Sequence, residues 1–298
     1  MRAAVLTRLG APLELVSGLR WAPLERGQVL VEVAYSGVCH SQVMEARGRR
    51  GEDPHLPHLL GHEGTGRVVE VGRDVTKVRP GDAVVLGWIA GLGLEGGPVR
   101  YEAEGRRFNA GSVTTFNDFA VVSENRLAAL PPGVGLDVGV LLGCAVPTGS
   151  GIIVNEIAPA AGSSLCVFGL GGVGLSALMA ARLFDLETVI AVDVSPEKLA
   201  LATTFGATHT LNPGELDPVE AIRQITKGRG VDYAVEATGS ARVIEQAFES
   251  VRAGGGLCVF ASHPKAGDRI RLDPHALIRG KQIRGSWGGR SAPDSDLP

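Results

Sequence analysis

Three side chains that could hold a metal ion lie far apart in this 298-residue sequence. Cys39 stands in the segment GVCHS, His62 in GHEGTG, and Cys144 in LGC. Two thiolates and one imidazole, with a fourth position open to substrate, form a catalytic zinc site, whereas a structural site uses four protein ligands. The separations along the chain are too large for spacing alone to select these residues, so metal binding is a hypothesis at this point.

A glycine-rich turn in the second half of the chain could bind a pyrophosphate. Residues 169–174 read GLGGVG, which fits G-x-G-x-x-G and follows an apolar, strand-like run. In that pattern the first glycine allows a tight turn and the second lets the backbone approach the phosphates. The third lets the following helix pack closely, with its N-terminus facing the negative charge. The candidate cofactor-binding residues of this turn are Gly169, Gly171, Gly172, Val173 and Gly174.

An acidic residue ends the next strand-like run, Thr188–Asp193. The Asp193 carboxylate would accept hydrogen bonds from the adenosine ribose and would repel a 2′-phosphate, which favours NAD over NADP. Two structural alternatives stay open: a glycine turn that only packs a helix on a sheet, and a solvated carboxylate at a strand end.

These candidates fall in two regions with different patterns. The first half has short, alternating or β-branched runs bounded by glycine or proline, at 28–35, 67–71 and 83–86, and no long amphipathic helix before about residue 135. This pattern favours a barrel or sandwich. The second half alternates strands and helices, which implies parallel strands joined by right-handed crossovers. The expected strands are 164–168, 188–193, 233–236 and 257–260, and the expected helices are 173–184, 196–205, 218–226 and 240–251.

Composition excludes several classes of protein. Hydrophobic residues make up 44% and charged residues 20%, which is ordinary for a globular protein. The net charge of −3, without a long run of either sign, favours neither nucleic acid nor an anionic membrane as a partner. Four cysteines are too few for a disulfide framework and no cleavable signal is visible, so we expect a cytoplasmic protein.

The order of four motifs resembles a known family. GVCHS, GHEGTG, the Gly143–Cys144 context and GLGGVG resemble zinc-dependent medium-chain dehydrogenases of the alcohol dehydrogenase type, with the likeness running from Val29 to about Gly289. The resemblance implies an α/β plus β fold, with a GroES-like barrel (1–150), a Rossmann domain (151–290), a polar tail (291–298), and a zinc ion in the cleft between the domains.

The resemblance also implies roles for individual residues. Cys39, His62 and Cys144 would bind zinc, with Glu63 as a neighbouring or exchangeable ligand. Ser41 would hydrogen-bond the substrate hydroxyl and pass its proton outward. The remaining assignments are His40 near the cofactor pyrophosphate, Thr148 near the nicotinamide, Lys198 on the adenosine ribose and Trp88 in the substrate pocket. A small buried cysteine, a turn hydroxyl at Ser41 and a core aromatic at Trp88 are the structural alternatives.

The sequence departs from the family in three places. The stretch 87–112 contains no cysteine, so we expect one catalytic zinc ion and no structural zinc. Met44 occupies the usual position of a relay histidine, so the proton from Ser41 would leave through the nicotinamide ribose, water or another residue. Family members normally continue past 285–289 and return to the first domain, so an early end would uncover apolar surface on that domain.

Three histidines, His55, His58 and His62, have the spacing of one helical face. Pro54 and Pro57 argue against a helix there, so we interpret His55 and His58 as solvated or pocket-edge residues.

Together these features predict an oxidoreductase that uses zinc and NAD to interconvert a primary or secondary alcohol and its aldehyde or ketone. The family resemblance also implies a homodimer or higher homo-oligomer, paired through the last Rossmann strand near 283–287. The alternatives are a zinc-free quinone or enoyl reductase, which lacks this cysteine and histidine set, and a non-catalytic protein that binds NAD(H) and zinc.

Overall fold

The computed structural model describes residues 1–297 and divides them into two compact units. The first unit comprises Met1–Cys144 together with residues 292–297, and the second comprises Ala145–Ser291. The boundary therefore lies six residues before the expected one at 150/151. The reason is that the Pro and Gly residues near 147–151 belong to a helix, α3 (Ala145–Gly151). Pro147 is tolerated because it lies in the first turn of this helix. A Cβ on Gly149 would lie 2.1 Å from the Val173 carbonyl oxygen, so only glycine lets α3 pack this closely on the segment at Val173.

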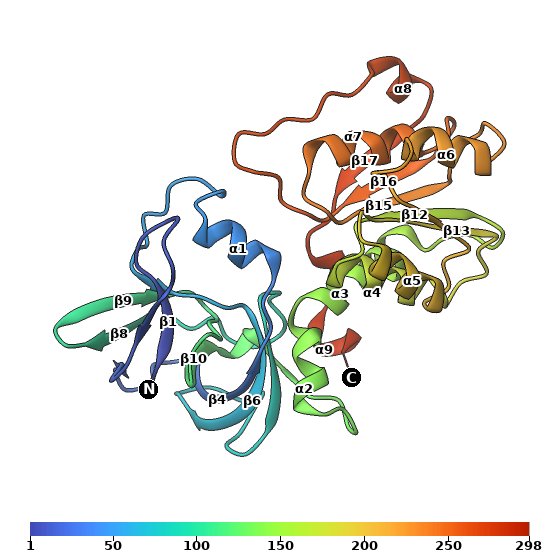
Figure 1. The fold of residues 1–298 in the computed structure, drawn as a ribbon. Coiled ribbons are helices and arrows are strands. Elements are labelled where there is room, and N and C mark those ends of the chain that lie inside the picture. Colours follow the sequence, from blue (N-terminus) through green and yellow to red (C-terminus); the bar gives the residue numbers. More distant parts are fainter. Residues whose placement is uncertain (298) are drawn as a thin grey trace. The chain divides into compact units, whose positions relative to one another are not determined.

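The first unit contains two sheets, in agreement with the expected β-rich GroES-like domain (Figure 1). In the five-stranded antiparallel sheet the apolar residues Val29, Val31, Val84 and Leu86 are buried. Its order is β10 (Phe119–Ser123), β4 (Gln28–Ser36), β6 (Glu63–Val71), β7 (Ala83–Gly87), β11 (Leu127–Ala129). The six-stranded sheet has the order β2 (Glu14–Val16), β1 (Ala3–Leu6), β5 (His58–Leu59), β9 (Arg106–Ala110), β8 (Val99–Ala103), β3 (Arg20–Trp21). Short helices complete the unit: α1 (His40–Ala46), η1 (Glu124–Arg126), α2 (Leu136–Gly139) and η2 (Val140–Gly143).

The second unit is built around one parallel sheet with the Rossmann order 3-2-1-4-5-6. In space the strands run β14 (His209–Leu211), β13 (Thr188–Val192), β12 (Ser164–Phe168), β15 (Tyr233–Glu236), β16 (Leu257–Phe260), β17 (Gln282–Gly285). The helices are α3, η3 (Ile152–Ile157), α4 (Gly172–Ala181), α5 (Pro196–Thr204), α6 (Pro218–Ile225), α7 (Ala241–Ser250), α8 (Pro274–Ile278) and η4 (Gly288–Arg290). The expected alternation of strands and helices is confirmed, with helix ends within three residues of expectation.

Local sequence signals explain several helix starts in this unit. The Ser195 hydroxyl accepts a hydrogen bond from the Lys198 amide at the start of α5, and Pro196 occupies its first turn. Asp217 caps α6 in the same way. Among residues 1–297 no single helix is long and apolar enough to cross a membrane, although the bent pair Leu136–Gly143 and Ala145–Ile157 reaches that length and composition together.

The end of the chain is not a free polar tail, which corrects the expectation for 291–298. Residues 293–296 form the short helix α9 (Pro293–Asp296), and Asp294 lies against the first unit. One Asp294 oxygen is 2.5 Å from Lys77 Nζ, and the other accepts a hydrogen bond from the Leu92 amide. Lys77 and Leu92 are far from Asp294 in sequence, so the polar composition of 291–298 gives no sign of these contacts. Residue 298 lies outside the described part of the chain.

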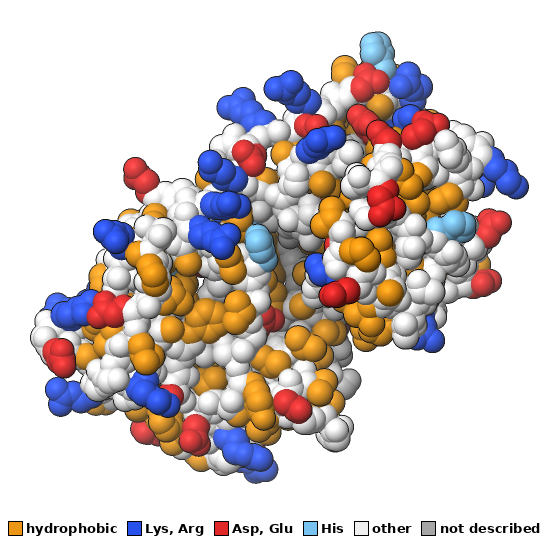
Figure 2. All heavy atoms as spheres, viewed as in Figure 1, with side chains coloured by type: hydrophobic (Ala, Val, Ile, Leu, Met, Phe, Trp, Pro, Cys, Tyr) orange, Lys and Arg blue, Asp and Glu red, His pale blue; other side chains and the backbone are white. Residues whose placement is uncertain are grey.

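Basic and acidic side chains are spread among apolar ones over the visible surface (Figure 2).

Candidate functional site

The structure brings Cys39, His62 and Cys144 together in the first unit. Their ligand atoms lie within 4.8 Å of one another, and the two sulfur atoms are 4.0 Å apart. Two thiolates on a tetrahedral zinc ion would lie ~3.8 Å apart, so the pair needs almost no rearrangement to bind zinc. The His62 Nε2 atom is buried and has no hydrogen-bond partner among residues 1–297, as expected of a ligand nitrogen. We name these three residues the thiolate site.

Two neighbouring strands deliver the first two of these side chains. Cys39 is the N-cap residue of α1, three residues after β4, and His62 immediately precedes β6. β4 and β6 are antiparallel, with Ser36 opposite Gly64, so the end of one strand lies beside the start of the other. The Gly37 amide donates to the Glu63 carbonyl oxygen at 3.1 Å and holds the two segments in this position.

Close backbone contact brings the third ligand. Cys144 follows η2, and a Cβ on Gly143 would lie 2.5 Å from the Leu86 carbonyl oxygen and 2.9 Å from Glu63 Cα. Only glycine therefore lets η2 approach β6 and β7. Gly61, directly before His62, has φ +94°, and a Cβ there would lie 2.3 Å from Thr115 Oγ1. Two of the many glycines are thus explained by close backbone approach beside the ligands.

The two cysteines share one proton in the absence of a metal. A hydrogen bond from Cys144 to Cys39 is the largest influence that lowers the pKa of Cys39. The same pairing, with burial, raises the pKa of Cys144, and the nearby Glu63 charge raises it further. This arrangement stabilises a thiolate at Cys39, which is the form that binds metal.

Other expected residues surround the thiolate site. The Ser41 hydroxyl is buried, contributes to the lowered pKa of Cys39, and has no well-aligned hydrogen bond within the described chain. Glu63 is 5% exposed and lies outside the group of three ligand atoms. Trp88 follows β7, and its side chain contacts the Cys144 sulfur and lowers its pKa. On α1, His40 is exposed and Met44 is buried, so the Met44 side chain occupies a relay position without a titratable group.

The phosphate turn has the geometry expected from GLGGVG. β12 ends at Phe168, Gly169 has φ +87°, and α4 begins at Gly172 with Gly171 as its N-cap. A Cβ on Gly174 would lie 1.8 Å from the Gly169 carbonyl oxygen, whereas a Cβ on Gly171 would meet no atom within 4 Å. One glycine thus serves helix packing, and the other leaves open space beside the backbone, as a pyrophosphate site requires.

Asp193 is held beside this turn directly after β13. Its Oδ2 accepts a hydrogen bond from the Leu170 amide at 2.7 Å, and its Oδ1 accepts one from the Ser195 amide at 2.9 Å. Lys198 Nζ is 3.7 Å from Oδ2, so both residues expected at the adenosine ribose lie together. In α3, the Thr148 hydroxyl is buried without a hydrogen-bond partner in the described part of the chain.

Sequence reasoning missed one residue at this edge of the sheet. Glu236, the last residue of β15, is fully buried, and burial raises its pKa. Its Oε1 accepts hydrogen bonds from the Thr238 and Gly239 amides, and Thr238 approaches Gly169 of the phosphate turn. An acidic residue at the carboxyl end of an expected parallel strand was the available signal.

Residues 87–112, the stretch that contains no cysteine, are fixed in place by hydrogen bonds and ion pairs of two carboxylates, Glu95 and Glu124. The Glu124 side chain accepts hydrogen bonds from the amides of Thr76, Lys77 and Leu94. Burial opposes ionisation of Glu95, but hydrogen bonds from Ser112 and Asn125 and the charge of Arg126 lower its pKa to about 2. These ionised groups tie the segment to η1 and to residues 76 and 77.

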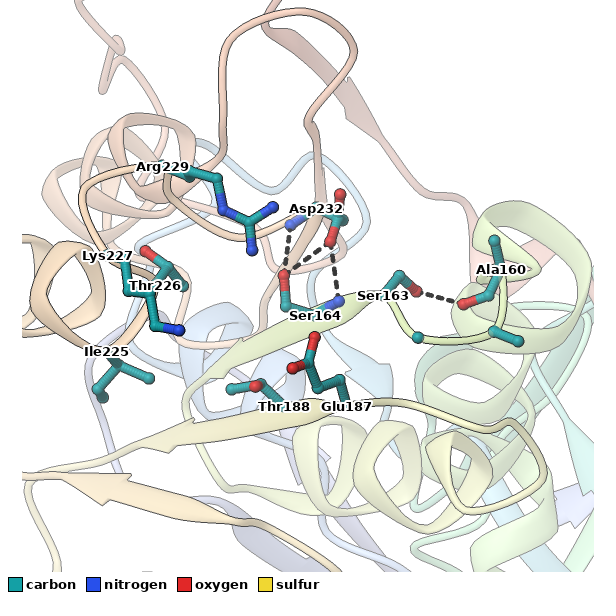
Figure 3. Close-up of a pocket in the computed structure, with 12 residues that line it drawn as sticks. Ala160, Ser163, Ser164, Glu187, Thr188, Ile225, Thr226, Lys227, Arg229 and Asp232 are labelled. Carbon is teal, nitrogen blue, oxygen red and sulfur yellow. Dashed lines mark hydrogen bonds between the residues drawn. The ribbon is translucent and has the colours of Figure 1, made fainter.

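A pocket of about 350 Å³ lies at the amino ends of the parallel strands, whereas the phosphate turn lies at their carboxyl ends (Figure 3). It is lined by the first residues of two strands, Ser164 and Thr188, and by Asp232 just before β15. Asp232 accepts hydrogen bonds from the amide and hydroxyl of Ser164, as Figure 3 shows. Ligands of such sheets bind at the carboxyl ends of the strands, so this pocket is not the cofactor site.

Comparison with known proteins agrees with this architecture. Residues 25–132 match the alcohol dehydrogenase GroES-like domain, and residues 172–297 match the zinc-binding dehydrogenase domain. The chain is 36% identical over 325 aligned positions to an S-(hydroxymethyl)glutathione dehydrogenase of Photobacterium damsela subsp. piscicida, covering 100% of this chain and 87% of that protein.

Solved structures show the same relationship. A benzyl alcohol dehydrogenase from Acinetobacter calcoaceticus superposes with a TM-score of 0.87 at 30% identity, covering 100% of this chain and 86% of that one. An alcohol dehydrogenase zinc-binding domain protein from Burkholderia ambifaria gives a TM-score of 0.84 at 34% identity, with the same coverage. With the thiolate site and the Rossmann sheet, these matches show that the chain belongs to the zinc-type medium-chain alcohol dehydrogenase family of oxidoreductases.

Proposed function

We propose that this chain oxidises an alcohol, or reduces the corresponding aldehyde or ketone, with one catalytic zinc ion and NAD. The observation that carries the proposal is the convergence of the thiolate site. Its two sulfurs are 4.0 Å apart, and the buried His62 Nε2 has no hydrogen-bond partner within residues 1–297. When bound, zinc supplies a Lewis acid that lowers the pKa of an alcohol hydroxyl, and NAD supplies the hydride acceptor.

The chain's own residues then have defined tasks. Cys39, His62 and Cys144 would hold the metal. Ser41, whose buried hydroxyl lies beside Cys39, would accept the hydrogen bond of the alcohol and pass its proton on. The buried Met44 cannot carry this proton further, so it leaves through water or a ribose hydroxyl. Trp88, in contact with the Cys144 sulfur, forms a wall of the alcohol site.

The second unit binds the dinucleotide. The open backbone at Gly171 would receive its pyrophosphate, and the Asp193 carboxylate, next to Lys198, would accept hydrogen bonds from the adenosine ribose. Thr148 would offer its buried hydroxyl to the nicotinamide end. For His40, whose ring is exposed, the contact with the pyrophosphate is assigned by the family resemblance alone. The metal-ligand role requires reduced cysteines, which fits a cytoplasmic protein.

The primary experiment is a screen of primary and secondary alcohols with NAD, following NADH formation, combined with a zinc count per chain. NADH formation by protein that carries zinc at the thiolate site supports the proposal, whether or not a further ion is bound elsewhere. One zinc ion with tight NADH binding and no turnover would instead support a non-catalytic homologue. Turnover of quinones or enoyl substrates without zinc would replace the proposal by the reductase alternative.

Cofactor choice is tested at Asp193. Asp193→Asn keeps one acceptor oxygen but removes the negative charge, so kcat/KM with NADP should rise relative to NAD by about tenfold, or ~1.4 kcal/mol. Lys198→Met, which removes the neighbouring positive charge, should change the ratio in the opposite direction. An unchanged ratio in both variants would remove Asp193 from the cofactor site.

We also propose that two chains associate through β17. This strand forms an edge of the parallel sheet, and the nearby Trp287 side chain is 70% exposed. Light scattering of the wild-type protein and of Ile283→Lys tests the interface: a dimer that becomes a monomer supports it, and an unchanged mass contradicts it.

A further inference from the structure

A second group of ligand-type side chains lies in the first unit, outside the thiolate site. Glu45 near the end of α1, Asp53 in the following loop and His58 at the start of β5 place one ligand atom each within 4.8 Å of the others. His58, which we expected to be solvated or at a pocket edge, is instead 8% exposed. That expectation was wrong because β5 pairs with both β1 and β9 and carries the His58 ring into the protein.

The orientation of the His58 ring is determined by the backbone. Its Nδ1 lies 2.9 Å from the Leu59 carbonyl oxygen, which can only accept, so Nδ1 carries the proton. The other nitrogen, Nε2, lies 2.7 Å from Asp53 Oδ2 and 3.8 Å from Glu45 Oε1. A neutral imidazole would thus direct a lone pair at two carboxylates, an arrangement that requires a cation between them, either a proton or a metal ion.

The donor set and its supports match those of a divalent metal site. Nitrogen and oxygen ligands at about 2.1 Å from a tetrahedral zinc ion lie ~3.4 Å apart. The distances from His58 Nε2 to Asp53 Oδ2, 2.7 Å, and to Glu45 Oε1, 3.8 Å, lie on either side of that value. A hydrogen bond from a metal-binding histidine to a backbone carbonyl is also the usual outer support. The Asp53 and Glu45 side chains keep 14% and 23% of their surface exposed, which leaves a path for an ion.

Further contacts orient both carboxylates without using the inward-facing atoms. Asp53 Oδ1 accepts a hydrogen bond from the His55 amide at 2.9 Å. Glu45 Oε2 accepts one from Gln42 Nε2 at 3.1 Å and lies 3.5 Å from Arg50 Nη1. Arg50 balances the charge of the Glu45 carboxylate, and the charge of the Asp53 carboxylate remains for a cation bound between the two acids and His58.

We propose that Glu45, Asp53 and His58, named the carboxylate site, bind a second divalent cation of the zinc or cobalt class. This ion has a structural role, because Gln42 connects the site to the ligands of the thiolate site. Gln42 lies on α1, whose N-cap is Cys39, and its Oε1 accepts a hydrogen bond from the amide of Gly61, the residue before His62. An ion at the carboxylate site therefore stabilises both segments that carry the first metal.

Cobalt distinguishes the two sites, because a thiolate ligand gives Co²⁺ an intense charge-transfer absorption that imidazole and carboxylate ligands do not give. Chelator-treated wild-type protein is titrated with Co²⁺ while bound metal and absorption are measured together. We expect two ions per chain, with the charge-transfer band complete after one of them. Cys144→Ala should bind one ion and show no band of normal intensity.

The carboxylate-site variants complete the test. Asp53→Asn and Glu45→Gln should each bind one ion with the charge-transfer band intact, whereas Glu52→Gln, at an exposed neighbouring acid, should bind two.

Two results would overturn the proposal. One is a wild-type chain that binds a single cobalt ion with the full charge-transfer band, which would leave a proton as the cation at His58. The other is a second ion that persists in the Asp53→Asn, Glu45→Gln double variant. Failure of the thiolate site itself is seen separately, as a missing charge-transfer band in the wild-type protein.

Discussion

The thiolate site and the carboxylate site lie in the same unit, and each contains one histidine, yet they differ in chemistry and in how they are assembled. The thiolate site joins three segments that are distant in sequence through close backbone contacts at glycines. The carboxylate site joins residues 45, 53 and 58, which lie within one short stretch. Soft sulfur ligands suit a retained zinc ion, whereas an oxygen-rich ligand set is expected to bind such an ion more weakly. The comparison suggests a division between a metal for chemistry and a metal for support.

The largest effect should follow removal of a sulfur. We expect Cys144→Ala to lose the zinc of the thiolate site and to lower turnover by about 10³-fold or more, since a metal Lewis acid contributes several kcal/mol to the reaction. NADH binding should persist, because the phosphate turn belongs to the other unit. Metal analysis, kinetics and NADH titration measure these three outcomes.

Cys258→Ala is the matched control for that variant. Cys258 is also a buried cysteine, in β16, but it belongs to neither ligand group. It should keep the zinc ion of the thiolate site and its turnover. Normal turnover in a zinc-free Cys144→Ala protein would contradict the role of the thiolate site.

Two histidines four positions apart give the next comparison. His62→Ala should abolish zinc binding at the thiolate site, as Cys144→Ala does. His58→Ala should keep that zinc ion but lower the free energy of unfolding by about 1–3 kcal/mol, because Asp53 loses its partner in a half-buried position. Urea unfolding and metal analysis of both variants separate the two effects. Equal zinc loss in both would show that the two groups are a single cooperative site.

The smallest effect concerns acid stability. Burial opposes ionisation of Asp53, but the His55 amide and the His58 side chain lower its pKa overall. A lowered pKa in the folded state means that Asp53 stabilises the protein above its unfolded pKa of about 3.9, and that this contribution disappears as pH falls through the folded value.

Asp53→Asn should therefore be less stable than wild type near neutral pH, and the difference should shrink between about pH 5 and pH 2. Urea unfolding at a series of pH values measures it, with Glu52→Gln as the control. A constant difference across this range would show that ionised Asp53 does not contribute.

Much of the fold could be predicted because its signals are local. The strands at 164–168 and 233–236 appear at the expected residues, since short apolar runs bounded by turn residues are typical of buried parallel strands. The phosphate turn was also predictable, because all of its residues are contiguous. The polar composition of 291–298 indicated a tail, however, since the Lys77–Asp294 ion pair leaves no local signal.

The candidate site was predictable only in part. The resemblance selected Cys39, His62 and Cys144, and the structure brings them together. His58 was assigned to a solvated position because the two prolines beside it argued against a helix, and the burial of a two-residue strand has no periodicity to detect. Glu236 was missed because its position beside the phosphate turn depends on strand order.

The amino-acid sequence by itself determined the elements with short-range causes: the glycine turn, the helix caps at Ser195 and Asp217, and the alternation of strands and helices. Only the tertiary structure decided which distant atoms meet. Sulfur atoms 105 residues apart come within 4.0 Å because antiparallel register and side-chain-free glycines bring three backbones together. Such contacts depend on packing between segments, and packing is a property of the whole unit rather than of any stretch of its sequence.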